Sequence, residues 1–273
     1  MTPNSKLVAI DLIRKVSLTA TCDTLDIPMT DKAPLKLLCV TAHPDDECFG
    51  FGGALMLAAE AGIETSVLCF TDGQAATNRG ASTTPEHLGE MRRAEFAASC
   101  KILDVTHHEL LDYQDAQLEF ANFSETAAKL VKRIRDYKPQ VVLTFGLDGA
   151  MNTHADHTMV SAFTTAAFHW AASPKRFPEL GPVHTAQRLF YNTTNFFFPG
   201  RPAPLPAPWT VTLDVRRVQH RKFEAFRAHT SQLPLMEKFQ SFFEKRVGQE
   251  FYTLAATPHP RAAVQETDLF AGL

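Results

Sequence analysis

The sequence has few cysteines and no cysteine pattern that builds a structural site. Its five cysteines are an odd number, and no two of them form a Cys-x-x-Cys pair. Cys39 and Cys69 instead fall inside apolar runs, where reduced core cysteines are common. The sequence therefore gives no support for a disulfide framework or for a structural zinc site built from cysteines.

Long apolar runs and an excess of charge of one sign are also absent. No stretch reaches the roughly 18 apolar residues of a membrane-spanning helix, and residues 1–20 lack the continuous apolar run of a signal peptide. The formal net charge is only -3, from 27 basic and 30 acidic residues. These features argue against a nucleic-acid-binding surface and a membrane span, and they indicate a cytoplasmic protein.

What the sequence does contain is a regular alternation of apolar runs and helical patterns. Short apolar runs, typical of strands buried on both faces, occupy residues 35–42, 64–71, 105–111 and 140–146. Helical patterns follow them at 52–62, 85–103, 124–138 and 157–172. The alternation predicts an α/β fold, in which a Rossmann-like, mostly parallel sheet carries helices on both faces.

The two ends of the chain depart from this alternation. Residues 1–34 carry no strong pattern and are predicted to be an N-terminal extension of a single domain, residues 35–273. Near the other end, the proline- and phenylalanine-rich segment 196–209 predicts a loop, 209–215 a strand and 215–229 a helix. We expect this C-terminal part to complete the sheet and to wall the pocket.

Two clusters of histidine and acidic residues follow strands of the predicted sheet. They are His43, Asp45, Asp46 and Glu47 after the first strand, and His154, Asp156 and His157 after the fourth. Ligands of α/β proteins bind at the edge where the carboxyl ends of parallel strands meet. The two clusters are therefore expected to share one site.

Histidine and carboxylate side chains at this edge indicate a divalent metal. His43 and Asp46 are three residues apart at a turn into a helix, and their imidazole and carboxylate groups suit zinc. Taken separately, the acids of the first cluster could simply begin a helix, and the two histidines of the second cluster could lie on the surface. Three protein ligands plus a water are typical of catalytic zinc, and a neighbouring carboxylate and histidine then fit amide hydrolysis.

The motifs resemble those of the LmbE-like family of zinc-dependent N-deacetylases, also called PIG-L. The segment AHPDDE at 42–47 has the usual family form, and HADH at 154–157 differs from the family's HPDH only at Ala155. Weaker similarity occurs in order at 69–75, 88–103, 110–118 and 221–232. The resemblance implies hydrolysis of the N-acetyl group of an N-acetylglucosamine-type sugar or conjugate, with release of acetate and a free amine.

The resemblance also implies roles for the matching residues. The ligands of one zinc ion per chain, or of another divalent metal, would be His43, Asp46 and His157. Asp45 would be the general base. His154 would stabilise the oxyanion and act as general acid, and Asp156 would hold His154 and favour its protonated form.

Further matching positions would surround the sugar. Arg92 would bind sugar hydroxyls, with a plain helix-surface arginine as the alternative and Arg93 as a competitor for the role. Asp115 would line the pocket. Glu47 would either support the turn or cap the helix. Three late residues would either close the pocket or end a helix: His229, Ser231 and Gln232.

Several other functions remain to be weighed. A Rossmann nucleotide site is disfavoured, because the glycines near residue 50 lack the G-x-G-x-x-G spacing and the acidic cluster would repel a pyrophosphate. A Cys48 nucleophile is disfavoured because neighbouring carboxylates raise a thiol pKa. A metal-dependent amidase of a sugar–thiol conjugate stays possible, as does a metal-retaining, non-catalytic sugar-binding protein. Metal binding alone would not require Asp45 and His154.

The substrate is less well defined than the chemistry. Gln74 stands where many family members carry glutamate, and 147–153 is poorer in glycine and tyrosine than its family counterpart. We expect a small-molecule N-acetylated amino sugar or conjugate as the partner, no nucleic-acid partner and no membrane span. A homo-oligomer is compatible with the sequence.

Overall fold

A seven-stranded sheet lies at the centre of the described part of the chain, residues 34–197, 203–246 and 248–273 of this computed structural model. Its strands are β1 Lys36–Thr41, β2 Glu64–Thr71, β3 His107–Tyr113, β4 Val141–Phe145, β5 Arg188–Thr193, β6 Val211–Asp214 and β7 Gln249–Ala256. The strand order is β3-β2-β1-β4-β5-β7-β6. The first five strands are parallel, β7 pairs antiparallel with β5, and β6 pairs antiparallel with β7 and so runs in the direction of the first five. The predicted fold class, a mostly parallel sheet, is confirmed.

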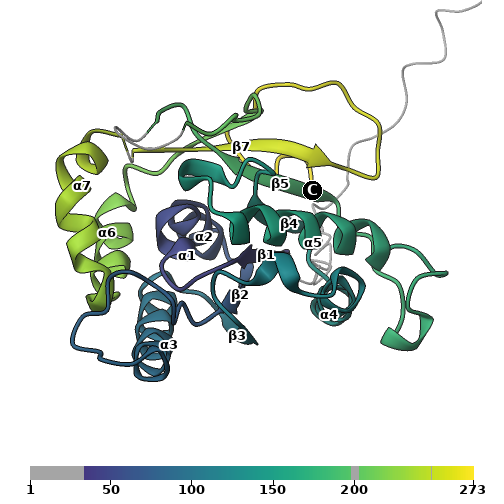
Figure 1. The fold of residues 1–273 in the computed structure, drawn as a ribbon. Helices are drawn as coiled ribbons and strands as arrows, with labels where there is room; N and C mark the ends of the chain where they lie inside the picture. The colour runs from purple at the N-terminus through teal and green to yellow at the C-terminus, as the bar shows by residue number, and fades with distance from the viewer. Residues whose placement is uncertain (1–33, 198–202, 247) are drawn as a thin grey trace, which may run out of the picture. The chain divides into compact units, whose positions relative to one another are not determined.

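Helices cover both faces of the sheet (Figure 1). They are α1 Asp46–Phe49, α2 Gly52–Glu60, α3 Pro85–Ile102, α4 Phe123–Tyr137, α5 Ala155–Ala171, α6 Gln219–Arg227 and α7 Leu233–Arg246. The strand order reverses at β1, and right-handed crossovers therefore place α2 and α3 on one face and α4 and α5 on the other. α6 packs against α3, on the face of the sheet that α2 and α3 cover, and α4 packs against α5.

The central strands form because their side chains are buried on both faces. Every residue of β4 is buried, and so is every residue of β1 after Lys36, which explains their continuous apolar runs. β2 spans the predicted residues, and α3 ends one residue earlier than predicted. The predicted N-terminal extension lies outside the described residues, apart from Pro34.

The C-terminal part completes the sheet, as predicted, but three of its elements were not assigned from the sequence: β5, α7 and β7. In β5 the apolar stretch is only Leu189–Tyr191, between the buried polar residues Arg188 and Asn192. Each of these two side chains bonds to main-chain carbonyls of a distant segment. Such burial of polar side chains depends on tertiary partners, and an apolar pattern does not reveal it.

Glu250 of β7 fastens the C-terminal part of the sheet to α2. Its carboxylate, which is 4% exposed, accepts hydrogen bonds from the main-chain N–H groups of Gly53 and Ala54 at 2.8 and 2.9 Å. Lys222 and the hydroxyl group of Tyr252 donate to the same carboxylate. An anion at a helix N-terminus is stabilised by the helix dipole, and here it also neutralises a buried lysine.

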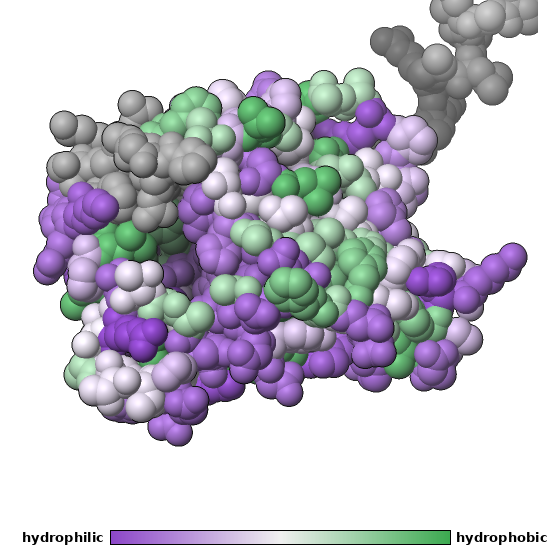
Figure 2. All heavy atoms as spheres, in the orientation of Figure 1, coloured by the Kyte–Doolittle hydropathy of each residue, from purple (hydrophilic) through white to green (hydrophobic). Residues whose placement is uncertain are grey.

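The polar clusters lie at the carboxyl ends of β1 and β4, which are neighbours in the sheet. On the face seen in Figure 2, a hollow opens between α6 and α1, with hydrophobic residues on one of its sides and hydrophilic residues on another. Among the described residues, no helix combines the length and the apolar character needed to span a membrane.

The Glu250 contacts predict a large stability effect. Glu250→Gln keeps the size of the side chain but leaves the buried Lys222 without its anion, so the free energy of unfolding should fall by about 3–5 kcal/mol. The same substitution at the exposed Glu244 of α7 should change it by less than about 0.5 kcal/mol. Denaturant unfolding of both variants measures the difference, and equal stabilities would contradict the proposed role of Glu250.

Candidate active site

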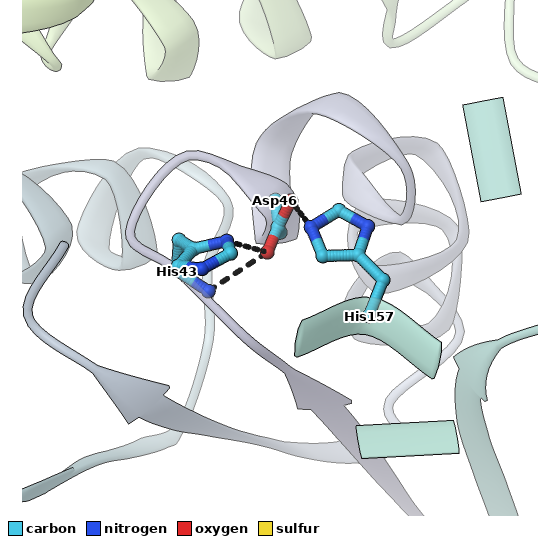
Figure 3. A group of neighbouring side chains, drawn as sticks. All are labelled: His43, Asp46 and His157. Atoms are coloured by element: carbon cyan, nitrogen blue, oxygen red, sulfur yellow. Dashed lines mark hydrogen bonds and ion pairs between the residues drawn. The ribbon is translucent and has the colours of Figure 1, made fainter. Parts of the chain in front are cut away.

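Three side chains from the two clusters converge at the switch point of the sheet. His43 follows β1, Asp46 begins α1 and His157 lies in the first turn of α5. One ligand atom from each lies within 4.8 Å of the others, and all three residues are buried. Figure 3 shows both imidazole rings turned toward the carboxylate of Asp46.

One hydrogen bond of His157 determines which of its two ring nitrogens carries the hydrogen, and so whether the nitrogen that faces Asp46 is protonated. Nδ1 lies 3.2 Å from the carbonyl oxygen of Gly149, and a carbonyl can only accept, so Nδ1 carries the hydrogen. In the neutral ring Nε2 is then an unprotonated acceptor. It is buried, has no hydrogen bond within the described residues, and lies 3.3 Å from Asp46 Oδ1.

His43 has the same arrangement with its nitrogens exchanged. Nε2 lies 2.9 Å from Asp115 Oδ1 and 3.2 Å from Asp156 Oδ2, so it donates to carboxylates. Nδ1 faces Asp46 Oδ2 at 3.6 Å. Two imidazole lone pairs and one carboxylate thus point at one another, and a divalent cation among them satisfies all three.

The charges of the site fit this conclusion. Burial opposes ionisation of Asp46, but His157 and His43 in their charged forms hold the pKa of its carboxyl well below the usual value. Burial likewise opposes a charged His43, yet contacts with Asp115, Asp156 and Asp46 raise the pKa of His43 well above the usual value. In the absence of metal, a proton on His43 takes the place of the cation.

A second group of possible ligands does not fit a metal. Glu47, Cys48 and His229 also bring ligand atoms within 4.8 Å of one another. The carboxylate of Glu47, however, already accepts from Ser99, from His229 and from the amide of Asp45. Burial and the nearby carboxylates raise the pKa of the Cys48 thiol, which also argues against Cys48 as a nucleophile.

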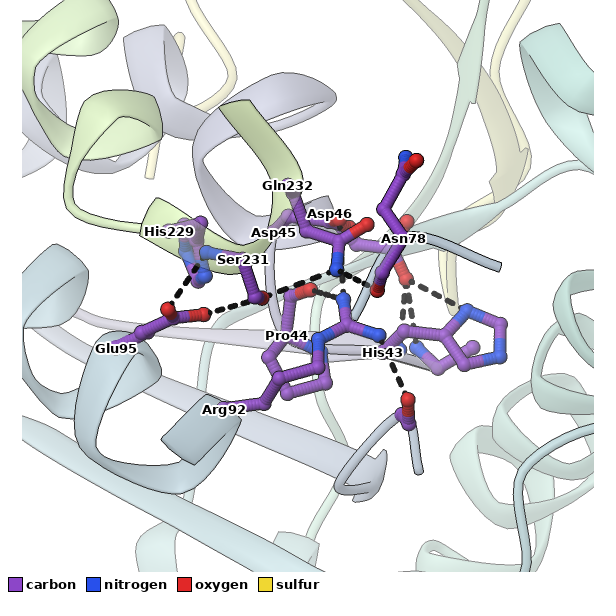
Figure 4. Close-up of polar contacts among 12 residues, drawn as sticks. His43, Pro44, Asp45, Asp46, Asn78, Arg92, Glu95, His229, Ser231 and Gln232 are labelled. Atoms are coloured by element: carbon purple, nitrogen blue, oxygen red, sulfur yellow. Dashed lines mark hydrogen bonds and ion pairs between the residues drawn. The ribbon is translucent and has the colours of Figure 1, made fainter. Parts of the chain in front are cut away.

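Asp45 is held beside the convergent ligands by Arg92 (Figure 4). Its backbone has a φ of 110°, a strained conformation for a residue with a side chain. Arg92 donates from Nη2 to Asp45 Oδ2 at 3.1 Å and to the Pro44 carbonyl, and from Nη1 to the Gly73 carbonyl at 3.0 Å. Burial, opposed by the attraction of Arg92, raises the pKa of Asp45 to about 6.

Arg92 and Arg93 have different environments. The side chain of Arg92 is 3% exposed, so the alternative of a plain helix-surface arginine is wrong for it. Arg93 is 46% exposed and pairs with Asp72. A Cβ atom at Gly73 would lie 2.0 Å from Arg92 Nη1, so glycine is needed there to admit the guanidinium group. Contact of Arg92 with sugar hydroxyls stays a prediction.

The geometry around His154 differs from the sequence-based expectation. The carboxylate of Asp156 does not hold His154; it contacts His43 and accepts from the amides of Ala116 and Leu118 at 2.7 and 3.1 Å. His154 Nδ1 instead accepts from the Asp156 main-chain N–H at 3.1 Å. Burial, together with His43 and His157, lowers the pKa of His154, which favours a neutral ring with its hydrogen on Nε2.

Asp115 lies next to the candidate metal ligand His43. It is 8% exposed, and besides His43 it accepts from the Ala75 amide at 3.0 Å. With Asp156 it forms a pair of carboxylates that orient one imidazole. The sequence predicted that Asp115 lines the pocket near the sugar. Its contact with His43 could not be predicted from motif spacing, because the two residues follow different strands, β3 and β1.

The site region lies within the part of the chain that a known family model matches. A model of the GlcNAc-PI de-N-acetylase family, PIG-L, matches residues 38–168, which include both clusters. A 1D-myo-inositol 2-acetamido-2-deoxy-alpha-D-glucopyranoside deacetylase of Salinispora arenicola is 30% identical over 297 residues, covering 90% of this chain and 94% of the relative. The chain belongs to the PIG-L family.

One further relative and one solved structure are also similar to this chain. A mycothiol S-conjugate amidase of Streptomyces coelicolor is 30% identical over 189 residues, covering 60% of this chain and 62% of the relative. The structure of an N,N'-diacetylchitobiose deacetylase from Pyrococcus horikoshii has a TM-score of 0.66 and 23% identity, covering 80% and 83% of the two chains. That likeness shows the shared fold. The resemblance found in the motifs is thereby confirmed.

The convergent acceptors of the PIG-L site predict which histidine holds metal. His157→Ala removes one of the three acceptors, and its metal content should fall from about one ion per chain to near zero after dialysis. His154→Ala, three residues away on the same segment, should keep its metal, because His154 Nδ1 is occupied by the Asp156 amide. Elemental analysis of both variants tests this; metal loss in the His154 variant would exchange the two roles.

Proposed function

We propose that this PIG-L protein is a zinc-dependent hydrolase that removes the N-acetyl group from an N-acetylglucosamine-type sugar conjugate. The observation that carries the proposal is the convergence of three acceptors on one point, beside a carboxylate that the metal does not require. The deacetylase relative that aligns over most of both chains supports this activity. Acetate and a free amino sugar would be the products.

The metal would be held by His43, Asp46 and His157. Zinc bound there would supply an acidified water molecule and a polarised amide carbonyl. The two carboxylates on His43 Nε2 would keep its other nitrogen directed at the metal and increase its basicity. The choice of zinc over another divalent metal is part of the proposal, because several divalent metals bind to a site of two imidazoles and one carboxylate.

Asp45 would be the general base. It is adjacent to a metal ligand, and Arg92 holds its Oδ2, so the position of its carboxylate is fixed before substrate binds. A pKa of about 6 leaves the carboxylate ionised at neutral pH yet basic enough to take a proton from the attacking water. Once protonated, Asp45 could pass that proton to the departing amine.

His154 would stabilise the oxyanion as a neutral hydrogen-bond donor. The Asp156 amide occupies Nδ1, which leaves the N–H on Nε2 for the developing negative charge. The lowered pKa of His154 favours this role over that of a general acid, and the protonated Asp45 is the better acid. Asp115 and Arg92 would lie around the sugar.

Two alternatives are less well supported. Amide hydrolysis of a sugar–thiol conjugate would use the same site, but the amidase relative aligns with only 60% of this chain. A sugar-binding protein without activity would gain nothing from the strained backbone of Asp45 or from its tie to Arg92. The proposed partner is a small molecule, and the cytoplasmic location and any homo-oligomer stay predictions.

Acetate release from a panel of substrates tests the proposed function. Purified protein would be incubated with N-acetylglucosaminyl-inositol, diacetylchitobiose, free N-acetylglucosamine and an amide-linked sugar–thiol conjugate. We expect acetate and primary amine in equal amounts from at least one N-acetyl compound, abolished by a chelator and restored by zinc. Cleavage of the sugar–thiol amide alone would favour the amidase, and no cleavage at all would refute the proposal.

Asp45→Asn should separate metal binding from catalysis. The amide cannot accept the proton of the attacking water, so kcat should fall by roughly 10²–10⁴-fold, while metal content stays that of the wild type. Asp136→Asn, at an exposed residue of α4 paired with Lys132, is the matched control and should keep full activity. Near-normal turnover of the Asp45 variant would assign the base elsewhere.

The raised pKa of Asp45 also predicts a pH dependence. A carboxyl group with a pKa of about 6 is increasingly protonated below that pH, and the protonated form cannot act as a base. The kcat/KM of the wild type should therefore fall as the pH is lowered through about 6. A flat profile between pH 5 and 7, measured with metal content held constant, would speak against Asp45.

A further inference from the structure

A buried histidine from the C-terminal part of the chain contacts the acidic cluster. His229 lies two residues after the end of α6, is 0% exposed, and belongs to the part of the chain beyond the residues matched by the family model. Its Nε2 lies 2.7 Å from Glu47 Oε1. Glu47 is equally buried, and an ionised carboxylate can only accept, so His229 donates this hydrogen bond.

The carboxylate of Glu47 links His229 to the main chain of Asp45. Its Oε1 receives two donors, His229 and the Ser99 hydroxyl at 2.5 Å, which leaves Oε2 for the main-chain N–H of Asp45 at 2.9 Å. That N–H belongs to the residue whose φ is 110°. A strained backbone persists only where its surroundings fix it, and Glu47 is one of the groups that fix this one.

His229 is itself fixed by the three residues that follow it (Figure 4). The hydroxyl of Thr230 and both the amide and the hydroxyl of Ser231 donate to Glu95 of α3, at 2.6, 2.8 and 2.7 Å. Gln232 donates to the Asn78 carbonyl in the loop before α3, at 3.1 Å. The turn is thus tied to the helix that carries Arg92, and none of these ties reaches a candidate metal ligand.

We infer that His229 is a positioning residue for Asp45 in the proposed deacetylation. Its imidazole orients the Glu47 carboxylate, which holds the Asp45 amide, while Arg92 holds the Asp45 side chain from the opposite end. His229 reaches neither substrate nor metal. Removing its donor should displace the base without removing the metal, so it should lower kcat and leave KM unchanged. The inference rests on the proposed function.

Two replacements of similar length separate this role from plain packing. His229→Gln retains an N–H group that can reach Glu47, whereas His229→Met fills the space without a donor. We expect the Gln variant to keep most of its activity and the Met variant to lose roughly 10–100-fold in kcat. Both should keep the metal content and the KM of the wild type and stay folded at the assay temperature. The Met variant should unfold at a lower temperature than the Gln variant, because the buried Glu47 carboxylate loses a donor.

The comparison of the two variants decides the inference. Equal kcat values for the Gln and Met variants would overturn it, because the donor would then be irrelevant. A Met variant that loses metal or unfolds in proportion to its loss of activity would also overturn it, by making His229 a structural residue only. A drop confined to kcat in the Met variant, with recovery in the Gln variant, supports it.

A readout independent of activity separates this inference from the proposed function. Hydrogen exchange of a peptide that spans residues 43–49 reports the protection of the Asp45 amide. It should be faster in the Met variant than in the Gln variant. If the wild type released no acetate, the proposed function would fail while this measurement still tested the tie between His229 and Asp45. Unchanged exchange in both variants would refute the tie.

Discussion

The structure depends on placing three consecutive carboxylates at the end of one strand, of which Asp46 and Glu47 are buried and Asp45 is partly buried. Such groups repel one another and lose hydration on burial, so each requires its own compensating partner. Asp45 has Arg92, Asp46 faces two imidazoles and the proposed metal, and Glu47 has His229. Apart from His43, which follows β1, the partners come from α3, α5 and the turn after α6. The site is therefore an assembly of distant segments around one short acidic stretch.

The same constraint explains what could be predicted from the sequence. The sheet and the two clusters were predictable, because continuous apolar runs and polar residues at strand ends are local patterns. The carboxylate contacts were not predictable: Asp115 and Asp156 both meet His43, and this follows from the relative position of three loops. Arg92 and Arg93 are neighbours in sequence, and only the packing of α3 decides which of them is buried.

The antiparallel end of the sheet is part of the same assembly. Glu250 caps α2, which begins only a few residues after the acidic stretch, and Lys222 of α6 neutralises Glu250. Short polar-flanked strands such as β5 escaped prediction because their buried arginine and asparagine find partners only in the folded chain. The C-terminal part thus supplies positive charge and hydrogen-bond donors to a catalytic edge that the N-terminal half presents.

The contact between His229 and Glu47 has a consequence for the growing chain on the ribosome. The two residues are separated by 182 positions in the sequence. At a synthesis rate of about 5–20 residues per second, Glu47 is synthesised roughly 9–36 s before His229. During that interval Glu47 lacks one of its donors and is better left in water. The native packing of α1 is therefore completed only after the segment that carries His229 has been made.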